Sequence, residues 1–179
     1  QLTVGRTARY YTLGKMDRPV KQVWFVCHGY GQLAGRFLRS FDVIDDGTRL
    51  IVAPEGLSRF YLGGSTGEHG PDAKVGASWM TREDRLSEIE DYVRYLDALY
   101  AEVFGRVDRS AVKLIALGFS QGAATVSRWI SRGGARADRL VLWGELVPPD
   151  LDLEAAKQTL RALELSLVYG REDRFVTAE

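Results

Sequence analysis

The sequence predicts an α/β fold, in which a doubly wound, mostly parallel sheet carries helices on both faces. Short, uninterrupted apolar runs alternate along the chain with segments whose apolar residues recur at helical spacing. The pentapeptide Gly118-Phe119-Ser120-Gln121-Gly122 stands between one apolar run and a segment of small residues. A strand, a tight turn and a helix in this order are typical of the turn that presents a nucleophilic serine.

Six strands are expected from the apolar runs, at residues 8–13, 23–27, 50–53, 112–117, 139–143 and 165–169. The run at 23–27 is apolar throughout, as expected of a strand that is buried on both faces. Right-handed crossovers between such strands place helices on both faces of the sheet. Ligands of these sheets bind beyond the carboxyl ends of the strands, so the residues that follow each strand are the first candidates for a site.

Three helices are expected between the strands. The first begins near Asp84, because Thr81 and Asp84 have the spacing of a capping box and apolar residues recur at helical spacing from Leu86 to Val103. Gly105 ends that pattern. The other two helices are expected from Ser120 to about Arg132 and at residues 155–163.

Length and composition limit the class of protein. The chain has 179 residues, enough for one domain (1–179) with a substantial core, and its formal net charge is zero. Zero net charge gives no reason to expect nucleic acid or an anionic membrane as a partner. No apolar stretch approaches the ~20 residues that span a bilayer, and no signal peptide opens the chain, so we expect a cytoplasmic protein. Cys27 is the only cysteine, which excludes an internal disulfide.

Ser120 is the candidate nucleophile, because the flanking strand and helix would present its hydroxyl at the edge of the sheet. The backbone N–H of Gln121 follows it at a helix N-terminus, where negative charge is stabilised. The N–H of Tyr30, in the glycine-rich loop after the 23–27 strand, is the second candidate oxyanion donor. His28 in that loop is either a base or a structural residue that bonds loop backbone, and the second role is preferred. Cys27 is expected to be a buried apolar residue.

A carboxylate after the last expected strand could orient a catalytic imidazole. Asp173 is the preferred candidate and Glu172 the second, whereas a solvated acidic pair is the structural alternative. Glu145, after the 139–143 strand, is a weaker candidate for the acid. His69 lies in a glycine-rich loop and is expected to be a surface residue.

An acyl-binding pocket is expected from apolar residues between the third strand and the long helix. Trp79, Met80 and Leu62, together with Phe60 and Tyr61, could line it. The alternative is that these side chains only cover the core. The sequence contains no Walker motif, no dinucleotide-binding glycine motif after a strand and no Cys/His cluster with metal spacing, so we expect no cofactor and no metal.

With these residues the chain resembles the phospholipase/carboxylesterase branch of the α/β-hydrolase superfamily, which includes the acyl-protein thioesterases and small bacterial carboxylesterases. The resemblance covers nearly the whole chain, and its most specific part is the pentapeptide around Ser120. The other matching segments are residues 26–31, 53–56, 77–79 with Asp84, and 169–176. The resemblance implies esterase or thioesterase activity without metal or cofactor. It assigns Ser120 as nucleophile, Asp173 as acid, and the Tyr30 and Gln121 N–H groups as the oxyanion hole.

The resemblance also predicts a catalytic histidine after Asp173, beyond a further helix and strand. Only six residues follow Asp173 in this sequence. We therefore expect a chain that lacks its C-terminal strand and helix and, with them, the catalytic base. An open sheet edge of this kind favours self-association. The alternative is an intact hydrolase that recruits His28 or His69.

The sequence thus favours a serine carboxylesterase or thioesterase that hydrolyses small or medium acyl esters through an acyl-serine intermediate. Its expected partner is a small acyl ester or thioester substrate. A second hypothesis is a catalytically silent hydrolase fold that binds a ligand or partner through the same pocket. A third is a fragment that needs a complementing segment from another chain.

Overall fold

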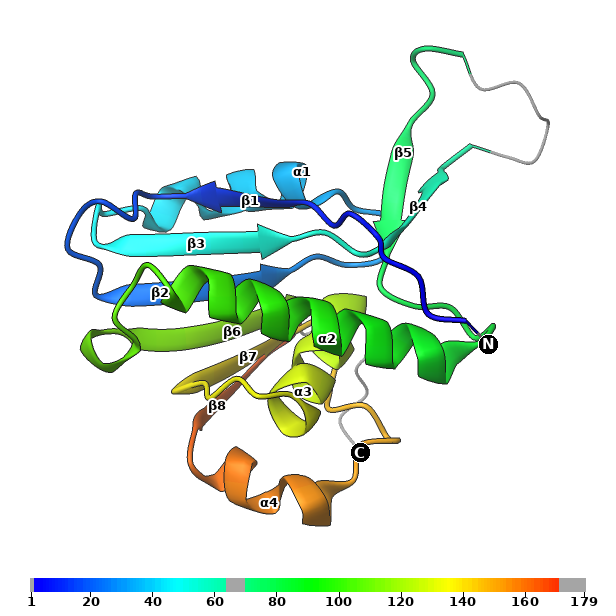
Figure 1. Cartoon of the computed structure of the whole chain (residues 1–179). Coiled ribbons are helices and arrows are strands. Elements are labelled where there is room, and N and C mark those ends of the chain that lie inside the picture. The colour runs from blue at the N-terminus through cyan, green and yellow to red at the C-terminus, as the bar shows by residue number, and fades with distance from the viewer. Residues whose placement is uncertain (1, 64–69, 171–179) are drawn as a thin grey trace.

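The computed structural model describes residues 2–63 and 70–170, and its main feature is a six-stranded sheet (Figure 1). The strand order is β1-β3-β2-β6-β7-β8, with β1 antiparallel to β3 and every other neighbouring pair parallel. A separate two-stranded antiparallel sheet pairs β4 with β5. The strands are β1 Tyr10–Leu13, β2 Gln22–Cys27, β3 Arg49–Pro54, β4 Ser58–Tyr61, β5 Val75–Ser78, β6 Lys113–Phe119, β7 Arg139–Trp143 and β8 Glu164–Val168.

Helices cover both faces of the main sheet. The helices are α1 Ala34–Leu38, α2 Arg85–Phe104, α3 Gln121–Arg132 and α4 Leu153–Arg161, with 3₁₀ turns at Arg39–Ile44 and Arg109–Ala111. Successive residues of β6 point to opposite faces, so Leu114 joins the core under α2 and α3 whereas Ile115 joins the core under α1. This arrangement confirms the predicted α/β fold with helices on both faces of a mostly parallel sheet.

The long helix begins where the sequence predicts, next to Asp84, but its start is stabilised differently. We expected a capping box over Thr81 to Asp84, but α2 starts at Arg85 and Asp84 has a left-handed backbone, with φ of 46°. The Thr81 N–H donates instead to the Glu88 carboxylate, one turn inside the helix, at 2.5 Å. The capping-box prediction is therefore wrong, because Thr81, the expected N-cap, is bonded by Glu88 from inside the helix and not by Asp84.

The sequence pattern did not indicate α1 or the β4–β5 ribbon. Both are short, and the ribbon is held by contacts with distant backbone, which periodicity does not reveal. A Cβ at Gly76 would lie 2.4 Å from the Gly31 carbonyl oxygen, and one at Gly56 would lie 2.5 Å from that of Ser78. Figure 1 shows the ribbon projecting from the end of the main sheet at which β2 and β3 finish.

The last helix and strand lie close to their predicted positions. The Asp152 carboxylate accepts a hydrogen bond from the Ala155 N–H and starts α4 two residues earlier than expected. Strand β8 lies at the edge of the sheet within the described ranges. Leu165 and Leu167 of this strand are each nearly half exposed. Self-association through this edge stays a prediction.

A buried arginine joins both large helices to the loop before α4. The Arg128 guanidinium contacts both oxygens of Asp150, at 2.7 and 3.2 Å, and also donates to the Tyr92 hydroxyl. Arg85 contacts the same carboxylate at 2.9 Å. Hydrogen bonding from Arg128, together with the nearby positive charge, lowers the pKa of the Asp150 carboxyl to about 2. Because Arg128 is almost fully buried, its charge depends on this partner.

Replacing Asp150 by Asn is expected to lower the free energy of unfolding by about 3 kcal/mol, because it leaves the buried Arg128 charge without its nearby negative charge. Urea titration at pH 7 measures this loss, with Glu154→Gln, which breaks an exposed pair with Lys157, as the control. The folded-state pKa of Asp150 lies below its usual value, so the stabilisation is complete above about pH 4 and declines towards pH 2. The difference between wild type and Asp150→Asn should therefore shrink with falling pH. A difference that is small at pH 7 or independent of pH would contradict this role.

Candidate active site

The candidate site lies at the carboxyl edge of the central strands. The register pairs Cys27 with Gly118 and Phe119 with Trp143. Trp143 in turn pairs with Val168. The segments that follow β2, β6, β7 and β8 therefore leave the sheet at the same end, the one formed by the carboxyl ends of the parallel strands, as predicted from the strand pattern. We call this end the carboxyl edge.

Ser120 occupies a strained turn between β6 and α3. Its φ and ψ are 51° and −121°, a conformation that residues other than glycine rarely adopt. Such strain persists only where the surroundings fix the backbone. Here the Ser120 N–H donates to the Trp143 carbonyl at 2.8 Å, and the Ser120 carbonyl accepts from the Ala123 N–H at 2.7 Å. The residue as a whole is partly buried.

The two glycines of the pentapeptide are required by close backbone contacts. A Cβ on Gly118 would lie 2.1 Å from the carbonyl oxygen of Gly122, across the turn. A Cβ on Gly122 would lie 2.1 Å from the carbonyl oxygen of Cys27 and 2.7 Å from that of His28. The first turn of α3 is therefore packed directly against the end of β2. The loop that follows β2, residues 28–32, is called the Tyr30 loop.

Two backbone N–H groups at this edge, those of Gln121 and Tyr30, are the candidate oxyanion donors. Gln121 is the first residue of α3, where N–H groups have no partner inside the helix. Within residues 2–63 and 70–170, neither its N–H nor that of Tyr30 has an acceptor. The neighbouring Gly31 N–H, by contrast, donates to the Ala77 carbonyl at 2.9 Å. Both candidate donors thus have no acceptor among the described residues, and they lie next to the turn that holds Ser120.

His28 bonds loop backbone through both ring nitrogens, as preferred from the sequence. Nδ1 donates to the Gly29 carbonyl at 2.8 Å, and Nε2 accepts from the Gly56 N–H at 3.0 Å. The ring is fully buried, and burial lowers the pKa of its imidazole. A neutral ring with both nitrogens occupied cannot take the Ser120 proton without breaking one of these bonds. Cys27 is buried as expected, and burial raises the pKa of its thiol.

The Gln121 side chain has a role that sequence reasoning missed. Its Oε1 accepts the Trp79 N–H at 3.0 Å, and its Nε2 donates to the Met80 carbonyl at 2.7 Å. Nε2 also lies 3.2 Å from the Ser78 hydroxyl oxygen. These partners lie 41 to 43 residues earlier in the chain, so no local sequence signal points to them.

The expected pocket residues lie in different surroundings. Leu62 is exposed and lies near Gly31 in the loop after β2. Met80 is partly buried and packs on the core under α2 and α3. Trp79 is 2% exposed, and its indole N–H donates to the His28 carbonyl at 2.9 Å. Their contact with an acyl chain stays a prediction.

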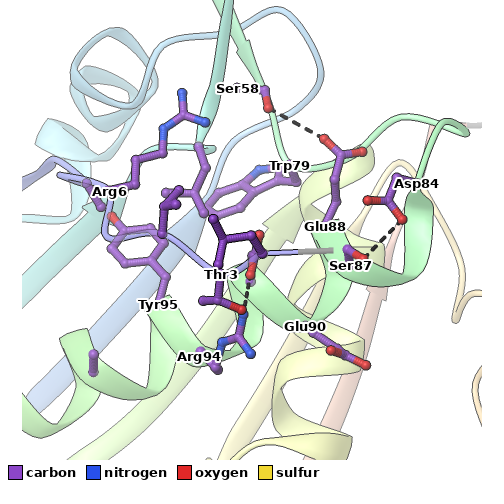
Figure 2. A pocket seen from close by; sticks show the side chains of 16 residues that line it. Thr3, Arg6, Ser58, Trp79, Asp84, Ser87, Glu88, Glu90, Arg94 and Tyr95 are labelled. Carbon is purple, nitrogen blue, oxygen red and sulfur yellow. Dashed lines mark hydrogen bonds and ion pairs between the residues drawn. The ribbon is translucent and has the colours of Figure 1, made fainter.

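A cavity of about 750 Å³ lies between the N-terminal segment and α2. Figure 2 shows Arg6 and Tyr95 on one side, Glu88 and Glu90 of α2 on the other, Thr3 between them beside Arg94, and Trp79 behind. Ser120, Tyr30 and Gln121 are not among its lining residues. The cavity is thus separate from the turn that holds Ser120.

Asp173, Glu172 and His69 lie outside the described residues. Glu145, the weaker candidate for the acid, is described and lies in the loop after β7, where its carboxylate accepts the N–H of Leu146. The acid and base of the site therefore remain predictions, whereas Ser120, Tyr30 and Gln121 all lie within the described residues.

Solved structures with the same architecture identify the fold. Acyl-protein thioesterase 2 from Zea mays aligns over 96% of this chain and 93% of its own, with 12% identity and a TM-score of 0.61. Esterase PE8 aligns over 96% and 94%, with 19% identity and a TM-score of 0.57. A Bacillus cereus carboxylesterase aligns over 95% and 88%, with 14% identity and a TM-score of 0.56.

The fold is that of the α/β-hydrolases. At these levels of identity the likeness shows the fold and does not by itself assign an activity. No protein-family model and no curated protein matches the sequence of this hydrolase-fold chain. In the part of the chain that the structure describes, no helix combines the length and apolarity needed to cross a membrane.

Proposed function

We propose that the protein is a serine carboxylesterase or thioesterase that hydrolyses small or medium acyl esters through an acyl-serine intermediate. The observation that carries this proposal is the strained turn at Ser120, which holds a serine between a strand and a helix. A strained backbone conformation lowers the stability of the fold, and such conformations cluster at active sites, where they position reacting groups. The two open N–H groups of Tyr30 and Gln121 at the same edge support it.

The proposed reaction has two halves. The Ser120 Oγ attacks the acyl carbonyl carbon, and the N–H groups of Tyr30 and Gln121 stabilise the negative charge that develops on the carbonyl oxygen. The serine proton passes to an imidazole oriented by Asp173 and then to the leaving alcohol or thiol. Water, activated by the same imidazole, attacks the acyl-serine and releases the acid and the free serine.

Exposed apolar side chains at the same edge support an acyl substrate. Tyr30 is 59% exposed and stacks on Phe60. Trp143, whose carbonyl binds the Ser120 N–H, is 41% exposed and packs edge-on against Phe119. We expect these side chains, together with Leu62, to contact the acyl chain, and burial of each of its methylenes there would contribute about 0.8 kcal/mol.

Labelling and turnover together test the proposal. In a chain that carries a catalytic histidine after Asp173, a fluorophosphonate probe should modify Ser120, identified by peptide mass spectrometry, and p-nitrophenyl esters with acyl chains of two to eight carbons should be hydrolysed. If the folded protein neither reacts with the probe nor hydrolyses any ester, the proposal fails. The alternative would then be a hydrolase fold that binds a ligand without turning it over.

Tyr30 should act through its backbone and not through its phenol. Tyr30→Phe keeps the N–H and is expected to leave kcat within about a few-fold of wild type, whereas Tyr30→Pro removes the donor and should lower kcat by about 10²–10³. Steady-state kinetics on one p-nitrophenyl ester compares the two variants. A large loss in Tyr30→Phe, with normal turnover in Tyr30→Pro, would show that this donor is wrongly assigned.

A further inference from the structure

Residues 75–80, which comprise β5 followed by Trp79 and Met80, contact both segments that carry the proposed oxyanion donors. At the Tyr30 loop, the Gly31 N–H donates to the Ala77 carbonyl at 2.9 Å, and the Ala77 N–H donates to the Gln32 carbonyl at 3.1 Å. A Cβ on Gly76 would lie 2.4 Å from the Gly31 carbonyl oxygen, so the two backbones are in direct contact. The residue next to Tyr30 is thus fixed to β5.

The same segment is bound to the nucleophile turn by the Gln121 side chain. The carboxamide accepts the Trp79 N–H at 3.0 Å and donates to the Met80 carbonyl at 2.7 Å. It thus bonds one backbone donor and one backbone acceptor, as the backbone of a neighbouring strand would. The Ser78 hydroxyl donates to the Met80 carbonyl at 2.8 Å and lies within reach of the carboxamide. The residue whose N–H is the second proposed donor is therefore anchored through its own side chain.

Trp79 adds a third connection, from residues 75–80 back to the start of the Tyr30 loop. Its indole N–H donates to the His28 carbonyl at 2.9 Å, and its ring lies 5.1 Å from the His28 ring. The edge of the Trp79 ring system also meets Tyr92 of α2. With 2% of its surface exposed, Trp79 can position backbone but offers little surface to a substrate.

We propose that residues 75–80 are a brace that sets the spacing of the two oxyanion donors, with the Gln121 and Trp79 side chains as its positioning residues. This inference rests on the proposed function and deepens it. An oxyanion hole requires both donors about 2.7–3.1 Å from one oxygen position, and here the donors belong to a loop and to a helix start. The brace bonds to both, and it also restrains the turn that holds Ser120 in its strained conformation.

Gln121→Glu and Trp79→Phe test the brace with small changes in shape. The first places a carboxylate oxygen against the Met80 carbonyl, and the second removes the indole N–H that binds His28. Each should lower kcat by about 10–100-fold, equally for acyl chains of two to eight carbons, with KM within about three-fold of wild type. Ser78→Ala, which removes one hydroxyl, should cost less than either.

Two matched controls separate positioning from stability. Gln158→Glu makes the same chemical change on an exposed face of α4 and should leave kcat unchanged. Trp129→Phe removes a buried indole N–H that binds Asp97, away from the donors, and should lower the urea midpoint without a matching fall in kcat. Urea titration of every variant shows which losses come from unfolding.

Amide hydrogen exchange provides a readout that does not need turnover. In Gln121→Glu and Trp79→Phe, exchange should quicken in residues 28–32 and 119–123 but not at the opposite ends of β2 and β6. Unchanged kcat in both variants, or unchanged exchange in both segments, would overturn the brace. A Trp79→Phe effect confined to some acyl lengths would also overturn it and would return Trp79 to the acyl pocket. The two proposals can also fail separately. If the wild-type protein hydrolyses no ester but the two variants still exchange faster in these segments, the proposed function is refuted and the brace is supported.

Discussion

In a chain that carries a catalytic histidine, replacing Ser120 by Ala is expected to lower kcat by a factor on the order of 10⁶, with little change in KM. Without the Oγ no acyl-serine forms, and binding and oxyanion donors alone remain. The backbone at this position is strained, at a φ of 51°, and alanine must adopt the same strain. The variant should therefore fold like wild type and lose chemistry, not structure. Steady-state hydrolysis of a p-nitrophenyl ester measures the change.

Ser127→Ala is the matched control for this experiment. Ser127 lies on the same helix and is fully buried, with its hydroxyl bonded to the Ala123 carbonyl, and its loss should leave kcat unchanged. Near-normal turnover in Ser120→Ala would exclude Ser120 as nucleophile. It would also bring back His28 and Cys27, whose burial and raised thiol pKa make them poor candidates in the present structure.

The strands and the nucleophile turn were predictable because their causes are local. In strand β6, Leu114 packs into the core on one face of the sheet and Ile115 into the core on the other. Consecutive residues must therefore both be apolar, and the sequence shows this as an uninterrupted apolar run. Gly118 is required by contact with Gly122, four residues away, within the same turn. Patterns that depend on neighbours in the chain can be recognised without knowing the rest of the fold.

The parts that could not be predicted depend on contacts between distant segments. The capping box at Thr81 failed because Glu88, inside the helix, binds the Thr81 N–H. The β4–β5 ribbon is held by Gly31 and Gln32, and the Gln121 carboxamide by residues 78–80. The sequence places a glutamine after the serine but carries no sign that its side chain reaches across the site.

The rate of ester hydrolysis also depends on the general base that takes the proton from Ser120. The sequence contains two histidines, and the described one, His28, keeps both nitrogens bonded to backbone and has a lowered imidazole pKa. A serine without a base keeps its proton at neutral pH and is a poor nucleophile. We therefore expect residues 1–179 alone to hydrolyse esters only about 10³–10⁴-fold faster than water, which is the level that an oxyanion hole and substrate binding can supply.

Supplying an imidazole beside Ser120 should raise that rate by a factor on the order of 10⁶, because loss of the histidine from such a site costs about as much as loss of the serine. The test compares residues 1–179 with the same chain extended by a strand and helix that carry a histidine in the family pattern after Asp173. The extended chain should gain kcat, and the gain should disappear in Asp173→Asn and on protonation of the imidazole below about pH 6. Full activity of residues 1–179 would contradict this expectation. His28→Asn and His69→Gln would then locate the base, since only the recruited histidine would be needed for kcat.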